Sequence, residues 1–459
     1  MEQITKPHCG ARLDRLPDCR WHSSMFAIVA FGLLVCWNNA VGGLILAQLK
    51  ALGWTDNSTT ATFSAITTAG MFLGALVGGI IGDKTGRRNA FILYEAIHIA
   101  SMVVGAFSPN MDFLIACRFV MGVGLGALLV TLFAGFTEYM PGRNRGTWSS
   151  RVSFIGNWSY PLCSLIAMGL TPLISAEWNW RVQLLIPAIL SLIATALAWR
   201  YFPESPRWLE SRGRYQEAEK VMRSIEEGVI HQTGKPLPPV VIADDGKTPQ
   251  AVPYSALLTG VLLKRVILGS CVLIAMNVVQ YTLINWLPTI FMTQGINLKD
   301  SIVLNTMSMF GAPFGIFIAM LVMDKIPRKT MGVGLLILIA VLGYIYSLQT
   351  SMLLITLIGF FLITFVYMYV CYASAVYVPE IWPTEAKLRG SGLANAVGRI
   401  SGIAAPYAVA VLLSSYGVTG VFILLGAVSI IVAIAIATIG IETKGVSVES
   451  LSIDAVANK

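Results

Sequence analysis

The sequence predicts an all-α membrane protein with twelve transmembrane helices, and two observations carry this prediction. Of the 459 residues, 56% are hydrophobic and only 12% are charged, whereas soluble domains carry about 25% charged residues. Apolar stretches long enough to cross a bilayer, about 20 residues each, recur along the whole chain. They lie near residues 25–48, 60–82, 90–107, 113–136, 148–170, 182–199, 266–291, 301–323, 331–348, 352–378, 391–414 and 421–439.

The composition excludes several classes of protein. A soluble enzyme, a nucleic-acid-binding protein and a disulfide scaffold do not fit so apolar a chain. The net charge of +8 is assigned to membrane topology, because basic residues of membrane proteins collect on cytoplasmic loops. The chain has no phosphate-binding loop of the form GxxxxGK[ST], and its His and Cys residues match no zinc-ligand spacing. We therefore expect no ATP coupling, no metal and no cofactor.

The orientation follows from the positive charges. Residues 1–24 contain arginines and prolines but no signal-peptide cleavage site, so they are predicted to remain as a cytoplasmic segment. With this end inside, the inward-facing segments hold 26 Lys and Arg residues and the outward loops hold 3. The positive-inside rule then places the tail at residues 440–459 in the cytoplasm as well.

The longest connection between spans, at residues 200–265, is predicted to be a cytoplasmic linker. It separates an N-terminal six-helix bundle at residues 25–199 from a C-terminal six-helix bundle at residues 266–439. Within the linker, apolar residues recur at helical spacing among charged ones, which predicts an amphipathic helix that lies against protein or lipid headgroups. These residues are Tyr215, Ala218, Met222, Ile225 and Val229.

Charged landmarks in the two halves repeat at nearly one offset. The run DKTGRR at Asp83–Arg88 recurs 241 positions later as DKIPRK at Asp324–Lys329. Two glutamate pairs repeat at offsets of 242 and 238, Glu138 with Glu380 and Glu204 with Glu442. A tandem duplication of a six-helix unit explains this register, so the two bundles are predicted to be pseudo-symmetric. Paired six-helix halves are typical of secondary transporters.

Six motifs sit at these loops and spans: GDKTGRR, RFVMGVGLG, EYMPGRNRG, PESPRWL, VPEIWPTE and ETKGVS. With them, nearly the whole chain resembles the major facilitator superfamily, and within it the sugar porter family and related bacterial metabolite:proton symporters. It is also similar to inner-membrane metabolite transporters of enteric bacteria. The resemblance implies a major facilitator fold in the bacterial inner membrane, transport by alternating access, and no covalent chemistry.

The resemblance also implies a cytoplasmic gate of ion pairs. A carrier with two states needs contacts that form in one state and break in the other, and carboxylate–guanidinium pairs suit that work. The alternative is that these are positive-inside residues with neighbouring acids. The implied gate residues are Asp83, Arg87, Arg88, Arg118, Glu138, Arg145, Glu204, Arg207, Asp324, Arg328, Glu380, Lys387, Arg389 and Glu442.

Three features of this gate are specific to the sequence. Arg118, which begins the RxxxGxGxG motif, is expected near the cytoplasmic end of its span and paired with an acid of the gate. Lys387 stands where the family has an arginine, and lysine lacks the planar fork of a guanidinium, so Arg389 is expected to replace it or the gate is weaker. Ile441 stands where the family has a proline.

Few ionisable residues lie within the spans, and such residues are candidates for function. Glu95 and His98 share one helix face at a spacing of three residues, so they could form a proton relay. A buried pair outside the transport path is the preferred interpretation, because the third span of each half is peripheral in this family. Arg399 lies well inside span eleven and is a candidate to hold an anionic substrate, the alternative being a structural ion pair or carbonyl contacts.

The family places its substrate cavity between the halves. Spans at that position contain the polar and aromatic residues expected of a pocket for a small molecule, although each of them could instead form a helix-packing hydrogen bond. With Arg399, the candidates are Trp37, Asn38, Asn39, Asn157, Trp158, Asn277, Gln280, Asn285, Trp286 and Tyr372. The paired glutamines of the family's span seven are reduced to Gln280, which argues against a hexose and leaves a polyol, a sugar acid or another polar metabolite.

The sequence therefore predicts a carrier, competent as a monomer, for a small polar metabolite of the sugar, polyol or sugar acid class. Proton-coupled relatives resemble one another in having an aspartate where this chain has Asn38. Because an amide cannot titrate, facilitated diffusion is favoured over proton symport. Two alternatives are a proton-coupled exporter of drugs or metabolites and a nutrient sensor built on the transport fold.

Overall fold

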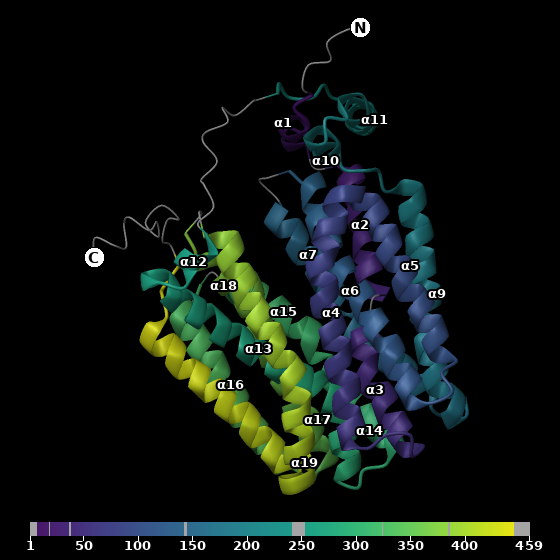
Figure 1. Cartoon of the computed structure of the whole chain (residues 1–459), viewed down its shortest axis with the longest axis vertical. Coiled ribbons are helices and arrows are strands. Elements are labelled where there is room, and N and C mark those ends of the chain that lie inside the picture. Colours follow the sequence, from purple (N-terminus) through teal and green to yellow (C-terminus); the bar gives the residue numbers. More distant parts are fainter. Residues whose placement is uncertain are drawn as a thin grey trace. The chain divides into compact units, whose positions relative to one another are not determined.

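The structure is a computed structural model that describes residues 7–17, 19–35, 38–141, 145–240, 253–323, 325–383 and 386–444. Within these ranges all regular secondary structure is helical, which confirms the predicted fold class (Figure 1). The first half contains α1 (Cys9–Asp14), α2 (Arg20–Val35), α3 (Asn38–Ala51), α4 (Asn57–Thr85), α5 (Arg87–Ala106), α6 (Met111–Tyr139), α7 (Arg145–Asn157), α8 (Ser159–Leu170) and α9 (Ala176–Tyr201).

The linker and the second half follow. The linker contains α10 (Pro206–Ser211), α11 (Tyr215–Thr233) and α12 (Tyr254–Leu257). The second half contains α13 (Gly260–Thr293), α14 (Leu298–Met309), α15 (Gly311–Val322), α16 (Arg328–Ser347), α17 (Met352–Cys371), a π-helix (Tyr372–Tyr377), α18 (Val378–Glu380) and α19 (Lys387–Ile439).

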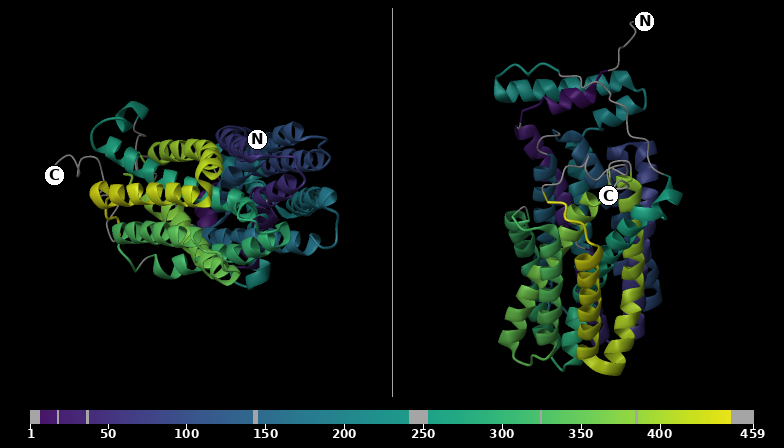
Figure 2. Two further views of the ribbon diagram at one scale, coloured as in Figure 1. Left: turned by 90° about the horizontal axis from the view of Figure 1, so that it is seen from below. Right: turned by 90° about the vertical axis from the view of Figure 1, so that its left-hand side faces the viewer.

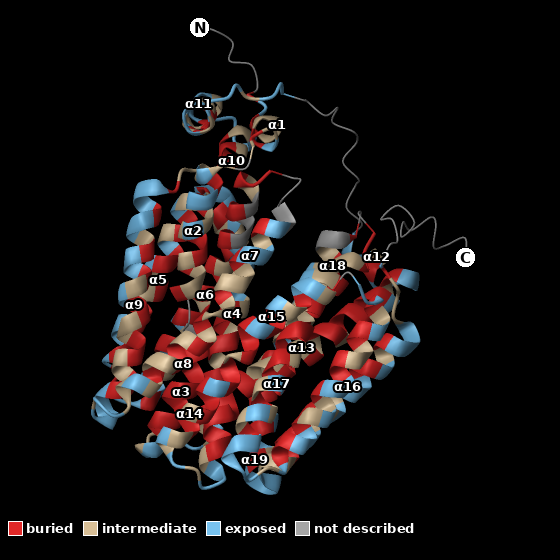
Figure 3. Ribbon diagram, turned by 180° about the vertical axis from the view of Figure 1, so that it is seen from behind, coloured by how far each residue is buried: buried red, intermediate tan, exposed pale blue. Residues whose placement is uncertain are grey.

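These helices match the predicted spans. Among the described residues, ten helical segments are long and apolar enough to cross a membrane. The predicted fifth span corresponds to α7 and α8, and the last two spans are the two parts of α19. They part at Gly417, whose φ of +64° is a backbone conformation that glycine adopts without steric cost. Exposed residues occur along α9 (Figure 3). The large hydrophobic ones among them include Ile189, Leu192 and Ile193, as a lipid-facing surface requires.

The duplication that the charged motifs predict is also present in the packing of the helices. In the first half, a Cβ atom at Gly70 would collide with the carbonyl oxygen of Phe119. In the second half, a Cβ atom at Gly311 would collide with the carbonyl oxygen of Phe360. Both members of the first pair lie 241 positions before their counterparts. Glycine at this position lets two helix backbones approach closely, so one steric constraint is repeated in both halves.

The chain forms two compact units whose boundaries differ from the predicted bundles. One comprises Met1–Asn38, Gly70–Ser159 and Leu184–Gly246, and the other comprises Asn39–Ala69, Tyr160–Gln183 and Lys247–Lys459. The second unit therefore contains α3, the first part of α4 and most of α8 together with the second half of the chain.

Within this second unit, contacts join segments of the first half to the second half. The Asn57 amide donates to the Ser414 hydroxyl at 2.9 Å, and the Asn305 amide donates to the Ser164 hydroxyl at 3.2 Å. A Cβ atom at Gly43 would collide with the carbonyl oxygen of Ile284, so α3 and α13 touch backbone to backbone. These three contacts are made by polar groups or at a glycine.

The amphipathic linker helix is confirmed as α11, and its apolar face lies against protein. Together with α1 and α10 it forms a small module, the linker module, which lies across the ends of the neighbouring helices (Figure 2). The core of this module consists of Cys9, Leu13 and Leu16 from the N-terminal segment and Trp208, Leu209, Ala218, Met222, Ile225 and Val229 from the linker. The N-terminal segment, predicted only as a cytoplasmic stretch, is thus docked on the linker.

Ion pairs hold the N-terminal segment on α11. The Arg12 guanidinium contacts Glu219 and also pairs with Glu226 at 2.6 Å, while Arg15 pairs with Glu226 at 2.6 Å. Burial acts to raise the pKa of Glu226, but the hydrogen bonds from the two arginines outweigh burial and lower it. A lowered carboxylate pKa stabilises the docked state above the ordinary pKa of 4.5, and this contribution is lost as the pH falls through the lowered value.

Replacing Arg12 by Gln should loosen the N-terminal segment, and Cys9 reports the change. Cys9 is buried, and burial together with the nearby Glu210 raises its pKa to about 12, so the docked thiol reacts slowly. In Arg12→Gln we expect maleimide to label Cys9 at least about tenfold faster at neutral pH, since charged hydrogen bonds contribute about 1.5–3 kcal/mol. Mass spectrometry of the N-terminal peptide measures the labelling rate.

Arg223→Gln is the matched control for this experiment. Arg223 also pairs with Glu219, at 2.6 Å, but its side chain is 70% exposed, so its loss should leave the labelling rate of Cys9 unchanged. Equal rates in the two variants would contradict the role of Arg12.

Candidate functional site

The first candidate site is built on the start of α5. Gly86, with φ of +97°, precedes the helix, and a Cβ atom there would collide with the carboxylate of Glu204. One oxygen of Glu204 accepts hydrogen bonds from the backbone N–H groups of Arg87 at 2.7 Å and Arg88 at 3.2 Å. The first N–H groups of a helix have no partner within the helix, and the helix dipole favours a negative charge there. Glu204, which follows α9, therefore ties the end of α9 to the start of α5.

The side chain of Arg87 extends this contact to two more helices. Its Nε donates to Glu138 near the end of α6 at 2.9 Å, and its Nη1 donates to Asp83 near the end of α4 at 2.7 Å. We call Asp83, Arg87, Glu138 and Glu204 the first charge cluster. The side chain of Asp83 is 65% exposed, whereas that of Glu138 is 21% exposed, so the pair with Glu138 is the better shielded from solvent.

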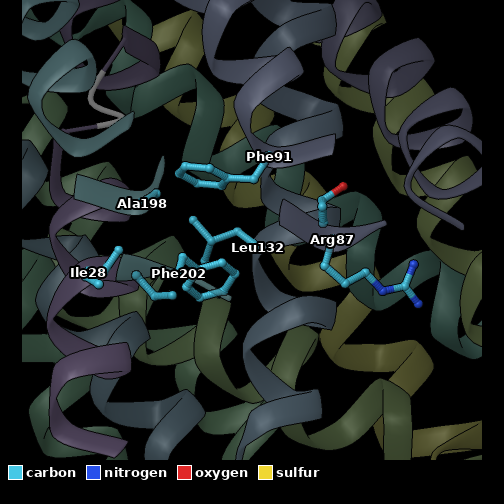
Figure 4. Close-up of a pocket in the computed structure, with 8 residues that line it drawn as sticks. Ile28, Arg87, Phe91, Leu132, Ala198 and Phe202 are labelled. Carbon is cyan, nitrogen blue, oxygen red and sulfur yellow. The ribbon is translucent and has the colours of Figure 1, made fainter. Parts of the chain in front are cut away.

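A small apolar cavity lies beside the stem of Arg87. In Figure 4 the guanidinium points away from the apolar side chains that line this cavity, among them Phe91, Leu132 and Phe202. The cavity volume of about 10 Å³ holds roughly one water molecule. It is therefore too small for a metabolite and serves to pack the cluster.

The second charge cluster repeats the first at the start of α16. Glu442 accepts hydrogen bonds from the backbone N–H groups of Arg328 at 2.8 Å and Lys329 at 3.1 Å. The Arg328 guanidinium donates to both oxygens of Glu380, at 3.0 and 3.1 Å. We call Arg328, Glu380 and Glu442 the second charge cluster. Burial acts to raise the pKa of Glu442, but the backbone donors, with Lys444 as a third, outweigh burial and lower it.

A tyrosine beside each cluster was not predicted. Tyr139 donates to the carbonyl oxygen of Pro203 at 2.6 Å, and Tyr377 donates to the carbonyl oxygen of Ile441 at 3.1 Å. Both tyrosines and both acceptors are separated by 238 positions, the offset that already related Glu204 to Glu442, so that offset could have revealed them. Because the acceptor is a backbone carbonyl, Ile441 keeps this contact, and its own N–H donates to the Tyr377 hydroxyl at 3.0 Å, which proline could not do.

Several predicted gate residues have other contacts. Arg88 donates to the carbonyl oxygen of Trp199 at 2.5 Å. Arg207 pairs with Asp14 of the N-terminal segment at 2.9 Å, and Arg389 lies over the ring of Tyr254 at 5.2 Å. Three further predictions lie outside the described part of the chain: Asp324, and the side chains of Arg145 and Lys387.

The expected position of Arg118 was wrong. It lies near the start of α6, whereas Glu138 lies near its end. Twenty residues of helix separate them by about 30 Å, so they cannot pair. Arg118 is 1% exposed and its Nη1 contacts the sulfur of Met121 at 3.9 Å. The mistake concerns direction: α5 and α6 form an antiparallel hairpin, so the start of α5 meets the end of α6.

Glu95 and His98 are brought together but shielded from solvent. Both side chains are fully buried, and Nδ1 of His98 lies 3.6 Å from a carboxylate oxygen of Glu95. The backbone of His98 packs against Gly124 of α6. The site is a close pair within the first unit, and its role in proton transfer stays a prediction.

A stripe of polar residues runs along α13, and two of its members face α19. Asn277, Tyr281 and Asn285 recur at intervals of four residues, and residues at this spacing share a helix face. A Cβ atom at Gly398 would lie 3.0 Å from the Asn277 amide, and one at Gly402 would lie 3.1 Å from the Tyr281 ring. The structure therefore places part of the predicted cavity set opposite the segment that carries Arg399. Nη1 of Arg399 is buried and has no hydrogen-bond partner among the described residues.

The remaining cavity candidates are separated from this stripe or lie outside the description. Trp286 lies in an apolar cluster with Ile290 and Val409, and Tyr372 stacks on Tyr377 with ring centroids 5.0 Å apart; their roles in substrate binding stay predictions. The others are as follows: Asn157 donates to the carbonyl oxygen of Ser153 at 2.7 Å, Trp158 and Gln280 are half-buried, and Trp37 with the side chains of Asn38 and Asn39 lies outside the described residues.

Comparisons with known proteins agree with this architecture. Residues 26–406 match the model of the Major Facilitator Superfamily. The chain is 99% identical over its full length, and that of the relative, to YdjK of Escherichia coli strain K12, whose name assigns it to metabolite transport. It is 44% identical to the inner membrane metabolite transport protein YdjE of the same strain, over 98% of this chain and 99% of that protein.

A solved structure shows the same fold. The partially occluded inward-open conformation of the xylose transporter XylE from E. coli superposes with a TM-score of 0.74 at 18% identity, covering 94% of this chain and 100% of that chain. The repeated charge clusters, the repeated glycine contacts and the match over most of the sequence lead to one conclusion. The chain belongs to the Major Facilitator Superfamily, a family of membrane transporters.

Proposed function

We propose that the protein carries a small polar metabolite across the bacterial inner membrane by alternating access, with both termini and the linker module in the cytoplasm. The observation that carries this proposal is the pair of charge clusters at equivalent positions in the two halves. Each cluster joins the start of one helix to the ends of others through bonds to Glu204 or Glu442. The protein works as a monomer, because the duplication supplies both halves of a carrier in one chain.

The clusters suit a reversible gate because of their energies. Exposed ion pairs contribute about 0–1 kcal/mol, and hydrogen bonds to charged groups contribute about 1.5–3 kcal/mol. Contacts of this size can bias two states without locking either one. The hydrogen bonds Asn57–Ser414 and Asn305–Ser164 join segments of the two halves. These bonds break when the carrier changes state.

The substrate is a small metabolite with hydroxyl groups and a carboxylate, such as a sugar acid. The amide oxygen of Asn277, whose Nδ2 donates to the carbonyl oxygen of Leu273 at 2.7 Å, and the amide of Asn285 can bind hydroxyl groups. The Nη1 of Arg399, which has no hydrogen-bond partner among the described residues, can bind a carboxylate. An unpaired buried donor costs free energy, which a bound anion would recover. Transport is facilitative, because Asn38 offers no titratable group in the first span.

Breaking either cluster should slow transport more than it weakens substrate binding. In Arg87→Ala and in Arg328→Ala we expect the uptake rate into proteoliposomes to fall about tenfold or more, as the loss of charged hydrogen bonds of about 1.5–3 kcal/mol implies. The melting-temperature shift caused by substrate should stay near the parental value, because the α13 stripe is intact. Asp83→Asn should have a smaller effect, since Asp83 is mostly exposed. Parental uptake in both arginine variants would contradict the gating role.

Arg399 should make the protein prefer carboxylated ligands. We expect gluconate to raise the melting temperature of the purified protein more than glucose does, because a ligand that binds only the folded state stabilises it. Arg399→Gln should abolish this difference. An unchanged ranking of the two ligands in the variant would show that Arg399 is structural.

The coupling mode is tested by uptake into proteoliposomes with and without an imposed pH gradient. A facilitator should equilibrate its substrate but not concentrate it, and Asn38→Asp should introduce a titratable group that permits accumulation. Accumulation by the parental protein above the external concentration, abolished by a protonophore, would overturn facilitated diffusion.

A further inference from the structure

A second, larger cleft lies between the linker module and the ends of the first-unit helices. Its volume is about 670 Å³, far larger than the cavity beside Arg87. α11 contributes one wall, and the ends of α2, α5 and α9 contribute the other. The side chains that concern its chemistry are Arg88, Arg214, Glu204, Glu217, Lys220 and Ser224.

The two acids of the cleft, Glu204 and Glu217, already have partners, so positive charge remains on the basic side chains of the cleft. Glu204 accepts the backbone N–H groups of α5, and Glu217 binds both ends of the Arg214 fork at 2.7 and 2.6 Å. Nε of Arg88 is buried with no hydrogen-bond partner among the described residues. Lys220 is exposed and forms no ion pair within the part of the chain that the structure describes. Two cations from opposite walls therefore remain to bind an anion.

The aromatic surroundings indicate where this anion comes from. Trp199 and Tyr201 end the membrane-spanning helix α9 and are 63% and 61% exposed. Exposed Trp and Tyr at the end of a span mark the level of the lipid headgroups. The Arg88 guanidinium lies 5.7 Å from the centre of the Trp199 ring, so the cation is held at this level. A phosphate at this depth is most readily supplied by a lipid.

We propose that this cleft binds the headgroup of an anionic phospholipid from the cytoplasmic leaflet, with its phosphate between Arg88 and Lys220 and its polar head beside Ser224. The proposal rests on the orientation given under the proposed function. Basic pockets on the cytoplasmic side of membrane proteins bind such headgroups. The bound lipid joins α11 to α5 and α9, and so couples the linker module to the membrane. Glu204 already links α5 to the end of α9.

Native mass spectrometry of the purified full-length protein tests the proposal. The protein is titrated with phosphatidylglycerol or phosphatidylcholine of the same acyl chains, and the retained lipids are counted. We expect phosphatidylglycerol to be retained more strongly, and Lys220→Gln to weaken its retention about fivefold, the effect of one cation near an anionic surface. Arg88→Gln should weaken it by a similar factor.

Arg223→Gln is the matched control, because it removes the same charge from α11 at a residue that does not line the cleft. It should retain phosphatidylglycerol like the parental protein. Equal retention of the two lipids, or equal losses in Lys220→Gln and Arg223→Gln, would overturn the proposal. Displacement of the lipid by inorganic phosphate at equal concentration would instead assign the cleft to a free phosphate compound. No transport substrate is present, so this result is independent of any failure of the proposed transport activity.

Discussion

The interaction on which both halves depend is the bond between a carboxylate and the free N–H groups at the start of a membrane helix. Glu204 and Glu442 each accept two such groups, one from the arginine that begins the helix and one from the next residue. Backbone donors at this place would otherwise require water or another acceptor. The carboxylate fixes the helix start, and this in turn directs the side chain of Arg87 or Arg328 toward its acid on the neighbouring helix.

The same bond explains why the linker begins where it does. Glu204 immediately precedes Ser205, whose hydroxyl accepts the N–H of Trp208 and caps α10. The indole of Trp208 then donates to the carbonyl oxygen of Asp83 at 2.7 Å. A chain of local contacts thus leads from the start of α5 through the first charge cluster to the linker module. Glu204 is the acid that connects them.

Most of the architecture could be predicted from the sequence, because span length and the offsets of charged residues follow directly from bilayer thickness and duplication. The choice of partners could not. Arg87 and Arg88 are neighbours in sequence, but they point about 100° apart around a helix, so one enters the charge cluster and the other turns to Trp199. Arg207 binds Asp14 because the N-terminal segment docks on the linker, a contact between residues almost two hundred positions apart. Local spacing carries no information about such a contact.

The cavity set was harder to predict than the charge clusters. Asn277 and Tyr281 face glycines of α19, which helical spacing on a single span can suggest. Trp286 lies on the same helix but packs in an apolar cluster. The neighbouring helices supply that cluster, and the sequence of one helix does not show them. Polar character singled out one helix as a candidate, whereas the face that each side chain occupies depended on its neighbours in three dimensions.

The docking of the N-terminal segment has a consequence for the synthesis of the protein. Leu13 leaves the ribosome early, but its partners Met222 and Ile225 follow some two hundred residues later, a delay of roughly 10–40 s at 5–20 residues per second. During that interval the first six spans must enter the membrane. The linker module can therefore assemble only after the first half of the carrier has been made.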